Sequence, residues 1–264
     1  MPSYSLITAL GSSFAAGAGV DPIVDAGAGR SGRNYPHQLA ERLGAELVDL
    51  TVSGATTDTL LDTAQTSWLT GAVYPPQLRG VPIDADLLTI TVGGNDLGFT
   101  GSMLYRALRN RQPGSAMAAE TLQRLGGSVP RPTAAVIRET TARLVRVVGG
   151  ARLAAPDARL VLVDYLTVLE RVDSARPASP FTDADLSLLL PIQDAVAAVF
   201  AGAAAETEID LVRASELGRG HAIGSTDPWL FPLDTSGDPG TASFHPTATG
   251  HAAVADALEA LLSD

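Results

Sequence analysis

The sequence contains no cysteine and no lysine among its 264 residues. Without thiols the chain forms no disulfide bond, offers no thiol nucleophile and holds no metal through cysteine. All 18 basic residues are arginines, so mechanisms that use a lysine Schiff base or a lysine general base are excluded. The lack of cysteine also means that the fold does not rely on an oxidising compartment.

Positive charge is scarce as well, because 29 acidic residues give the chain a net charge of −11. Nucleic-acid binding requires a basic surface, so we expect no nucleic-acid partner. No apolar run reaches the roughly 18 residues that cross a bilayer, and we expect no integral membrane segment. The first residues show no basic segment followed by a long apolar stretch. This predicts a cytoplasmic protein, or a secreted one if a signal peptide precedes this sequence.

The residues that are present predict a globular protein. Hydrophobic residues make up 45% of the chain and charged residues 18%, which is the composition of a folded domain rather than of a disordered segment. The length suits one domain with a well-buried core, and no internal repeat or linker divides the sequence. We therefore predict a single domain over residues 1–264, while the oligomeric state stays open.

Short apolar runs alternate with segments of helical spacing along the chain. The predicted strands are Ser5–Leu10, Glu46–Thr51, Leu87–Val92, Leu160–Tyr165 and Glu208–Val212. The predicted helices are Pro36–Leu43, Ala134–Leu153, Asp183–Ala204 and Thr247–Leu262. The alternation is typical of βαβ units, whose right-handed crossovers place helices on both faces of a parallel sheet. We predict an α/β fold, a flavodoxin-like three-layer α/β/α sandwich with a five-stranded parallel sheet. The stretches 17–32, 98–132, 166–182 and 213–243 are predicted to be loops.

Small and polar residues follow three of the predicted strands and precede the last helix. These clusters are Gly11-Ser12-Ser13-Phe14-Ala15-Ala16-Gly17, Ser53-Gly54-Ala55-Thr56, Gly93-Gly94-Asn95-Asp96 and Ser243-Phe244-His245-Pro246. In open α/β sheets the ligand site lies at the carboxyl ends of the strands, so the clusters are expected to meet there. Together they supply a hydroxyl, an imidazole, a side-chain amide and accessible backbone N–H groups. Those groups are the nucleophile, base and oxyanion donors of acyl transfer.

In order and relative position, the four clusters resemble the sequence blocks of the SGNH/GDSL hydrolases. The resemblance implies that Ser13 is the nucleophile of an ester hydrolase and that His245 is its general base. It also implies an oxyanion hole made by the backbone N–H groups of Ser13 and Gly54 and the side chain of Asn95. No cofactor or metal is implied, and the expected substrate is a small-molecule or lipid ester.

Other parts of the chain resemble the actinobacterial lipase branch of this family. They are Gly29-Arg30-Ser31, Asn34-Tyr35-Pro36, Gly220-His221 and Trp229. The secreted members of that branch carry cysteines in such loops, whereas this chain has none.

Two positions depart from the family pattern. The first block of the family reads Gly-Asp-Ser, and Ser12 stands here in place of the Asp. The family also places an Asp three residues before the His, where this chain has Ala242. A backbone carbonyl can hold the Nδ1 proton of a histidine, so we hypothesise a Ser13–His245 dyad whose imidazole is oriented by the Ala242 carbonyl. The alternative is a carboxylate from the preceding loop, Asp238 or Asp234.

Three other functions are considered beside this one. The same site could serve a carbohydrate O-acetylesterase, or the scaffold could be a binding protein without catalysis. The segment Gly27–Gly32 matches the dinucleotide pattern G-x-G-x-x-G, with Asp49 near the position of a ribose-binding acid, although the flanking strand and helix are poorly placed. For the hydrolase, the residues predicted to form an acyl pocket are Phe99, Met103, Leu104, Trp229 and Phe231.

Overall fold

The computed structural model describes residues 4–171, 179–234 and 242–263. Its centre is a five-stranded sheet in the order β4-β1-β7-β8-β9. The strands are β1 (Leu6–Gly11), β4 (Glu46–Asp49), β7 (Leu87–Thr91), β8 (Arg159–Val163) and β9 (Asp210–Val212). All four pairings are parallel, and the order is the 2-1-3-4-5 arrangement of flavodoxin-like folds. The predicted fold class is confirmed.

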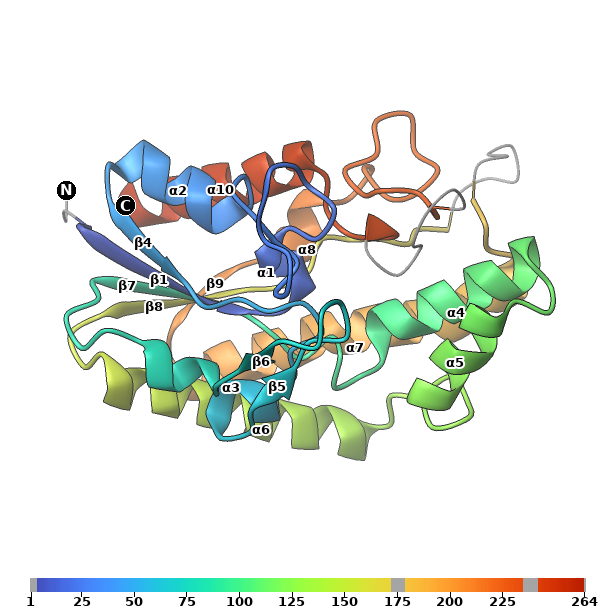
Figure 1. Ribbon diagram of the computed structural model, residues 1–264, viewed down its shortest axis with the longest axis horizontal. Helices are drawn as coiled ribbons and strands as arrows, with labels where there is room; N and C mark the ends of the chain where they lie inside the picture. Colours follow the sequence, from blue (N-terminus) through green and yellow to red (C-terminus); the bar gives the residue numbers. More distant parts are fainter. Residues whose placement is uncertain (1–3, 172–178, 235–241, 264) are drawn as a thin grey trace.

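Helices cover both faces of the sheet (Figure 1). One layer contains α2 (Tyr35–Leu43) and α10 (Ala248–Ser263), which pack against each other. The opposite layer contains α3 (Thr57–Leu61), α6 (Ala134–Ala154) and α7 (Asp183–Thr207). A strand enclosed on both faces needs apolar side chains at successive positions, and every residue of β7 is buried. Such an enclosed strand therefore appears in the sequence as a continuous apolar run, without alternation of apolar and polar residues.

Shorter elements complete the described part of the chain. They are α1 (Ser13–Ala16), β2 (Ile23–Asp25), β3 (Arg30–Ser31), β5 (Gln65–Thr66), β6 (Val73–Tyr74), a 3-10 helix over Gln77–Gly80, and α8 (Ala214–Leu217). Strands β2 and β3 form an antiparallel ribbon, and β5 and β6 form another.

The segment that matches the dinucleotide pattern belongs to the antiparallel ribbon β2–β3. The glycine-rich segment 27–32 lies in and beside the ribbon, not between a central strand and a helix as dinucleotide binding requires. Asp49 accepts hydrogen bonds from the Asn34 amide and from Thr51, so its carboxylate has a structural role. The nucleotide-binding reading of this segment is wrong.

The predicted loop 98–132 is also wrong, because it contains two helices. They are α4 (Phe99–Arg111) and α5 (Ala116–Arg124), which form a hairpin at the carboxyl end of the sheet (Figure 1). Ser115 caps α5 by accepting the Ala118 N–H. Polar and small residues interrupt the apolar spacing of both helices, and their stability depends on packing against each other and against α7.

Helix α7 has the length and the apolar composition to cross a membrane, with a mean hydropathy of 1.7 over its most apolar window. This differs from the expectation that no segment is long and apolar enough. In the structure the helix packs against α6, α4 and the sheet, and Leu189, Val196 and Phe200 are buried. Core helices of water-soluble proteins pass the same test of length and composition, so this finding is weak support for a membrane segment.

A buried carboxylate joins α4 to the start of α7. Asp185 is fully buried, forms an ion pair with Arg106, and accepts hydrogen bonds from Asn110 and from the Thr182 hydroxyl. Burial by itself raises the pKa of the Asp185 carboxyl, but the hydrogen bonds from Thr182, Asn110 and Arg106 outweigh it and lower this pKa. The ionised carboxylate therefore stabilises the fold above its unfolded pKa, and this contribution is lost as the pH falls through the lowered value.

The substitution Asp185→Ala should lower the free energy of unfolding by about 3 kcal/mol, because it leaves the Arg106 guanidinium without its buried partner. The matched control is Asp183→Ala, which removes an exposed carboxylate from the same helical turn and should cost less than about 1 kcal/mol. Urea denaturation at pH 7 measures both. Equal losses in the two variants would contradict the assigned role of the buried pair.

Candidate active site

The turn after β1 presents Ser13 at the carboxyl edge of the sheet. Ser12 has an extended backbone, and Ser13 then begins the single turn of α1, which ends at Gly17 in the left-handed conformation. The side chain of Ser13 is nearly buried, and it lines a cavity at this edge. A nucleophile at the end of a central strand and the start of a helix is held by rigid elements rather than by a loose loop.

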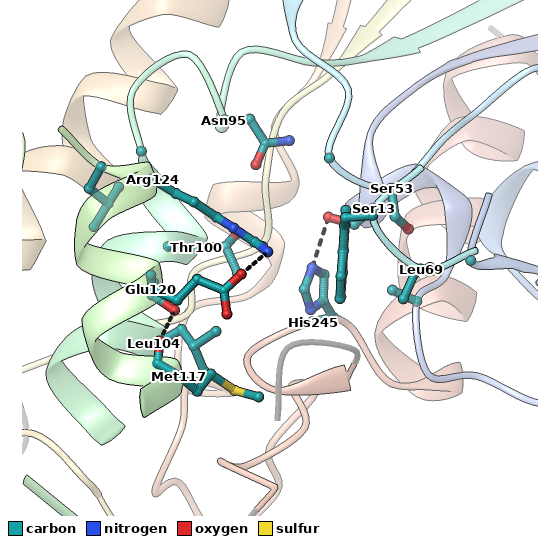
Figure 2. A pocket seen from close by; sticks show the side chains of 18 residues that line it. Ser13, Ser53, Leu69, Asn95, Thr100, Leu104, Met117, Glu120, Arg124 and His245 are labelled. Atoms are coloured by element: carbon teal, nitrogen blue, oxygen red, sulfur yellow. Dashed lines mark hydrogen bonds and ion pairs between the residues drawn. The ribbon is translucent and has the colours of Figure 1, made fainter. Parts of the chain in front are cut away.

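The structure brings Ser13 and His245 together although they are 232 positions apart. The Nε2 atom of His245 lies 2.8 Å from the Ser13 Oγ (Figure 2). The backbone of His245 is held by a short antiparallel contact, in which its carbonyl accepts the Phe231 N–H and Phe231 in turn accepts the Phe244 N–H. The ring of Phe14 packs beside the imidazole, with the two ring centres 5.3 Å apart.

Two backbone carbonyls act on the His245 ring: its Nδ1 contact is with Ser243, and the predicted Ala242 carbonyl also raises the pKa of the imidazole. The Nδ1 atom lies 3.0 Å from the Ser243 carbonyl oxygen, whereas the Ala242 carbonyl accepts the backbone N–H of His245. The tight turn from Ala242 to His245 points the Ser243 carbonyl at the ring, and this geometry is invisible in the sequence. Of the alternative carboxylates, Asp234 donates its backbone N–H to the Ser243 hydroxyl, and Asp238 lies outside the described residues.

The surroundings of His245 favour its neutral form. Burial lowers the pKa of the imidazole to about 4, and the Ser243 and Ala242 carbonyls offset this only in part. Because a carbonyl can only accept, the proton of the neutral ring belongs on Nδ1 and the Nε2 lone pair faces the Ser13 hydroxyl. This is the tautomer that can remove a proton from Ser13.

Two turns at the cavity each carry a backbone N–H group without an acceptor in the described part of the chain. Among the described residues, neither the Ser13 N–H nor the Gly54 N–H has a hydrogen-bond acceptor. Gly54 has a φ of +84°, in the left-handed region that glycine adopts without strain, and both residues line the cavity. Two N–H donors without acceptors beside a hydroxyl form a site that suits a developing oxyanion.

Asn95 stands across the cavity from Ser13 (Figure 2). Its side-chain nitrogen donates one hydrogen bond to the Ala55 carbonyl, at 2.8 Å, and the amide has a second N–H available. The neighbouring Asp96 accepts from both the N–H and the hydroxyl of Thr57. The turn after β7 is therefore bound through Asn95 and Asp96 to the turn that contains Gly54, and Asp96 acts as a loop anchor.

The cavity beside Ser13 has a volume of about 560 Å³ and largely apolar walls. Trp68, which lies beside Gly54, and Leu69 line it on one side, while Leu104, Met117 and Leu125 line it from the α4–α5 hairpin. Figure 2 shows Leu69 across the cavity from Leu104 and Met117. At its rim, Arg124 forms an ion pair with Glu120 and lies 5.9 Å from the centre of the Trp68 ring. Among the described residues no group of three or more His, Asp or Glu side chains is arranged to hold a metal.

Only Leu104 of the five predicted acyl-pocket residues lines this cavity. Phe99 and Met103 are buried in the core, and Trp229 stacks on His221. The sequence does not predict Met117 and Leu125 as lining residues, because the stretch 98–132 that contains them has the pattern of a loop. Trp68 carried a usable signal, because it is one of only two tryptophans in the chain and large aromatic side chains recur in ligand pockets.

Comparison with known proteins identifies the family of the chain. The sequence profile of the GDSL-like Lipase/Acylhydrolase family matches residues 9–253. Lipase 2 of Streptomyces coelicolor is 30% identical over 253 residues, covering 93% of this chain and 78% of that protein. A lipase of Streptomyces rimosus is 28% identical over 246 residues, covering 92% and 81%.

Two solved structures share the fold over nearly their whole length. The extracellular lipase of Streptomyces rimosus superposes with a TM-score of 0.71 at 23% identity, covering 97% of this chain and 99% of that one. Phospholipase A1 of Streptomyces albidoflavus superposes with a TM-score of 0.73 at 22% identity and the same coverage. The chain belongs to the GDSL-like lipase and acylhydrolase family and is a serine esterase or lipase.

Proposed function

We propose that this protein hydrolyses carboxylic esters through an acyl-enzyme formed on Ser13, with His245 as the general base. The observation that carries the proposal is the 2.8 Å contact between the Ser13 Oγ and the His245 Nε2. The Ser13 hydroxyl attacks the ester carbonyl while Nε2 takes its proton, and the imidazolium then gives that proton to the leaving alcohol. Water attacks the acyl-enzyme in the second half of the reaction, with His245 again as base.

The negative charge that develops on the carbonyl oxygen needs donors that are already in place. The N–H groups of Ser13 and Gly54 and the amide of Asn95 supply them in this proposal. Donors that are fixed before the reaction need no reorganisation when the charge appears, and that is why they lower the barrier.

The proposed catalytic unit is a dyad in which the Ser243 carbonyl replaces a carboxylate. This carbonyl keeps the Nδ1 proton in place and so maintains the reactive tautomer, at 3.0 Å from the ring. Its partial negative charge also stabilises the imidazolium, although less than a full carboxylate charge would. The low dielectric of the buried site strengthens that interaction.

The apolar cavity supports an apolar acyl chain rather than a sugar as the group beside Ser13. Five of its lining side chains are large and apolar, namely Trp68, Leu69, Leu104, Met117 and Leu125. Polar side chains such as Ser53, Thr100 and Thr121 also line the cavity, but its large side chains are mostly apolar, and that favours an apolar acyl chain. The extracellular location named for the Streptomyces rimosus lipase supports the secreted alternative for this chain.

The substitution Ser13→Ala should reduce ester hydrolysis by roughly 10⁵-fold, because the nucleophile is removed. It should also abolish covalent labelling by a fluorophosphonate. The control is Ser102→Ala, which removes a buried hydroxyl of α4 outside the cavity and should leave both measurements unchanged. Hydrolysis of p-nitrophenyl esters of increasing chain length provides the assay, and substantial turnover by Ser13→Ala would refute the proposal.

The acid limb of kcat/KM should lie near pH 4, because burial lowers the His245 pKa to about 4 and only the neutral imidazole can act as base. Activity should therefore stay constant from pH 8 down to about pH 5, and should fall about tenfold per pH unit below pH 4. The profile is measured over the range in which circular dichroism shows folded protein. A limb near the ordinary histidine value of about 6.5 would contradict this environment for the ring.

The substitution Asn95→Ala should lower kcat by about 10²–10³-fold, since it removes one oxyanion donor. KM should change little, because the interaction strengthens only in the transition state. Asn110→Ala is the control, because its amide also donates to a backbone carbonyl but does so outside the cavity. It loses a bond to Asp185 as well, so kcat is compared at a temperature at which both variants are folded. Steady-state kinetics on both variants separates the two parameters. An unchanged kcat in Asn95→Ala would remove this residue from the oxyanion hole.

A further inference from the structure

The hydroxyl of Tyr165 lies between the two turns that supply the proposed nucleophile and oxyanion donors. It is 2.9 Å from the Ser12 Oγ and accepts the Gly94 N–H at 3.2 Å. Ser12 directly precedes Ser13 in the turn after β1, and Gly94 directly precedes Asn95 in the turn after β7. One oxygen atom thus contacts both turns from beneath the reacting groups.

The Ser12 side chain bonds Tyr165 instead of capping the helix that follows it. Ser12 stands at the N-cap position of α1, yet its hydroxyl makes no capping hydrogen bond there. The side chain is fully buried and its Oγ bonds the Tyr165 hydroxyl instead. The family pattern has an acidic residue at this position, so a neutral Ser–Tyr pair occupies the place of a carboxylate.

The Gly94 backbone lies directly against the Tyr165 ring. A Cβ on Gly94 would be only 2.7 Å from the Cε1 atom of Tyr165, a distance that real side chains do not adopt. The absence of a side chain is thus what allows the Gly94 N–H to reach the hydroxyl. A residue of any other type would push the turn after β7 away from the ring.

The ring of Tyr165 is held on several sides by other aromatic residues. Its centre lies 4.6 Å from that of Phe14, 6.0 Å from Phe99 and 5.9 Å from Phe200. Burial raises the pKa of the Tyr165 hydroxyl to about 12, so the group keeps its proton at any working pH. The hydroxyl is therefore a neutral donor and acceptor in a fixed position.

We infer that Tyr165 is a positioning residue, whose hydroxyl sets the separation between the turn of Ser13 and the turn of Asn95 through Ser12 and Gly94. The inference rests on the proposed function, in which the donors on these two turns converge on one oxygen atom. Displacement of reacting groups by about 1 Å can lower a rate by up to about 10²-fold, so a small relaxation of either turn is costly. Tyr165 touches neither substrate nor reacting atoms in this scheme.

The test is Tyr165→Phe, which keeps the ring and removes only the hydroxyl. We expect kcat for p-nitrophenyl ester hydrolysis to fall by about 10-fold to 100-fold, with KM within about twofold of the wild type. The second-order rate of fluorophosphonate labelling should fall in parallel, because the phosphonyl oxygen uses the same donors. The acid limb of the pH profile should not move, since the contacts of His245 are unchanged.

The matched control is Tyr35→Phe. Tyr35 is equally buried, its hydroxyl bonds the Thr91 hydroxyl at 2.9 Å, and burial raises its pKa to about 12 as well. Tyr165→Phe removes two buried hydrogen bonds and Tyr35→Phe removes one, so both variants should lose melting temperature, but only Tyr165→Phe should lose kcat. A kcat in Tyr165→Phe equal to that of Tyr35→Phe, or a change confined to KM, would overturn the inference.

A second variant tests the same hydrogen bond from its other end. Ser12→Ala should lower kcat less than Tyr165→Phe does, because the Gly94 N–H keeps its acceptor. The double variant should be no slower than Tyr165→Phe alone, and independent, multiplying effects would argue against a shared role. Wild-type activity in Ser13→Ala would overturn the proposed function and this inference together. Loss of activity in Ser13→Ala with wild-type kcat in Tyr165→Phe would overturn the inference alone.

Discussion

The hydrogen bond between Ser13 and His245 joins the first strand of the chain to the turn before its last helix. The contact exists because parallel strands end at the same edge of the sheet and each crossover returns the chain to that edge. His245 does not follow a strand of the sheet. It is held at the edge by a backbone hydrogen bond from Phe231 and by the start of α10. The geometry of the site therefore depends on the whole sheet being assembled, and no local segment contains it.

The polar groups that hold the turns around this contact are buried or half-buried, and they are neutral. Tyr165, Ser12 and Asn95 connect the turns by hydrogen bonds, and His245 is itself uncharged at neutral pH. Asp96 follows Asn95 in the turn after β7, and burial raises the pKa of its carboxyl although Thr57 binds it. Neutral hydrogen bonds fix positions without a large desolvation cost, so the only charges that need to form are those of the transition state.

The parts of the site that could be predicted are those in which residue type and strand position coincide. Ser13 and Asn95 follow buried apolar strands and Gly54 follows the edge strand β4, and the structure places all three around one cavity. The residues that escaped prediction act through contacts between distant elements. Met117 and Leu125 reach the cavity only because α4 and α5 fold into a hairpin, and the sequence of this hairpin has weak apolar spacing. The dinucleotide pattern was already weak in the sequence, because its flanking strand and helix are poorly placed, and the β2–β3 ribbon agrees with that weakness.

The sequence by itself determined the layered fold, the order of the five central strands and of the helices α2, α6, α7 and α10, and the four clusters at the carboxyl edge. It could do so because apolar runs and helical spacing are local properties that the chain expresses directly. Only the tertiary structure decided which carbonyl faces the His245 ring, how Tyr165 connects two turns, and which side chains line the cavity. Those outcomes depend on distances of about 3 Å between residues far apart in sequence, and such distances are set by the packing of the assembled elements.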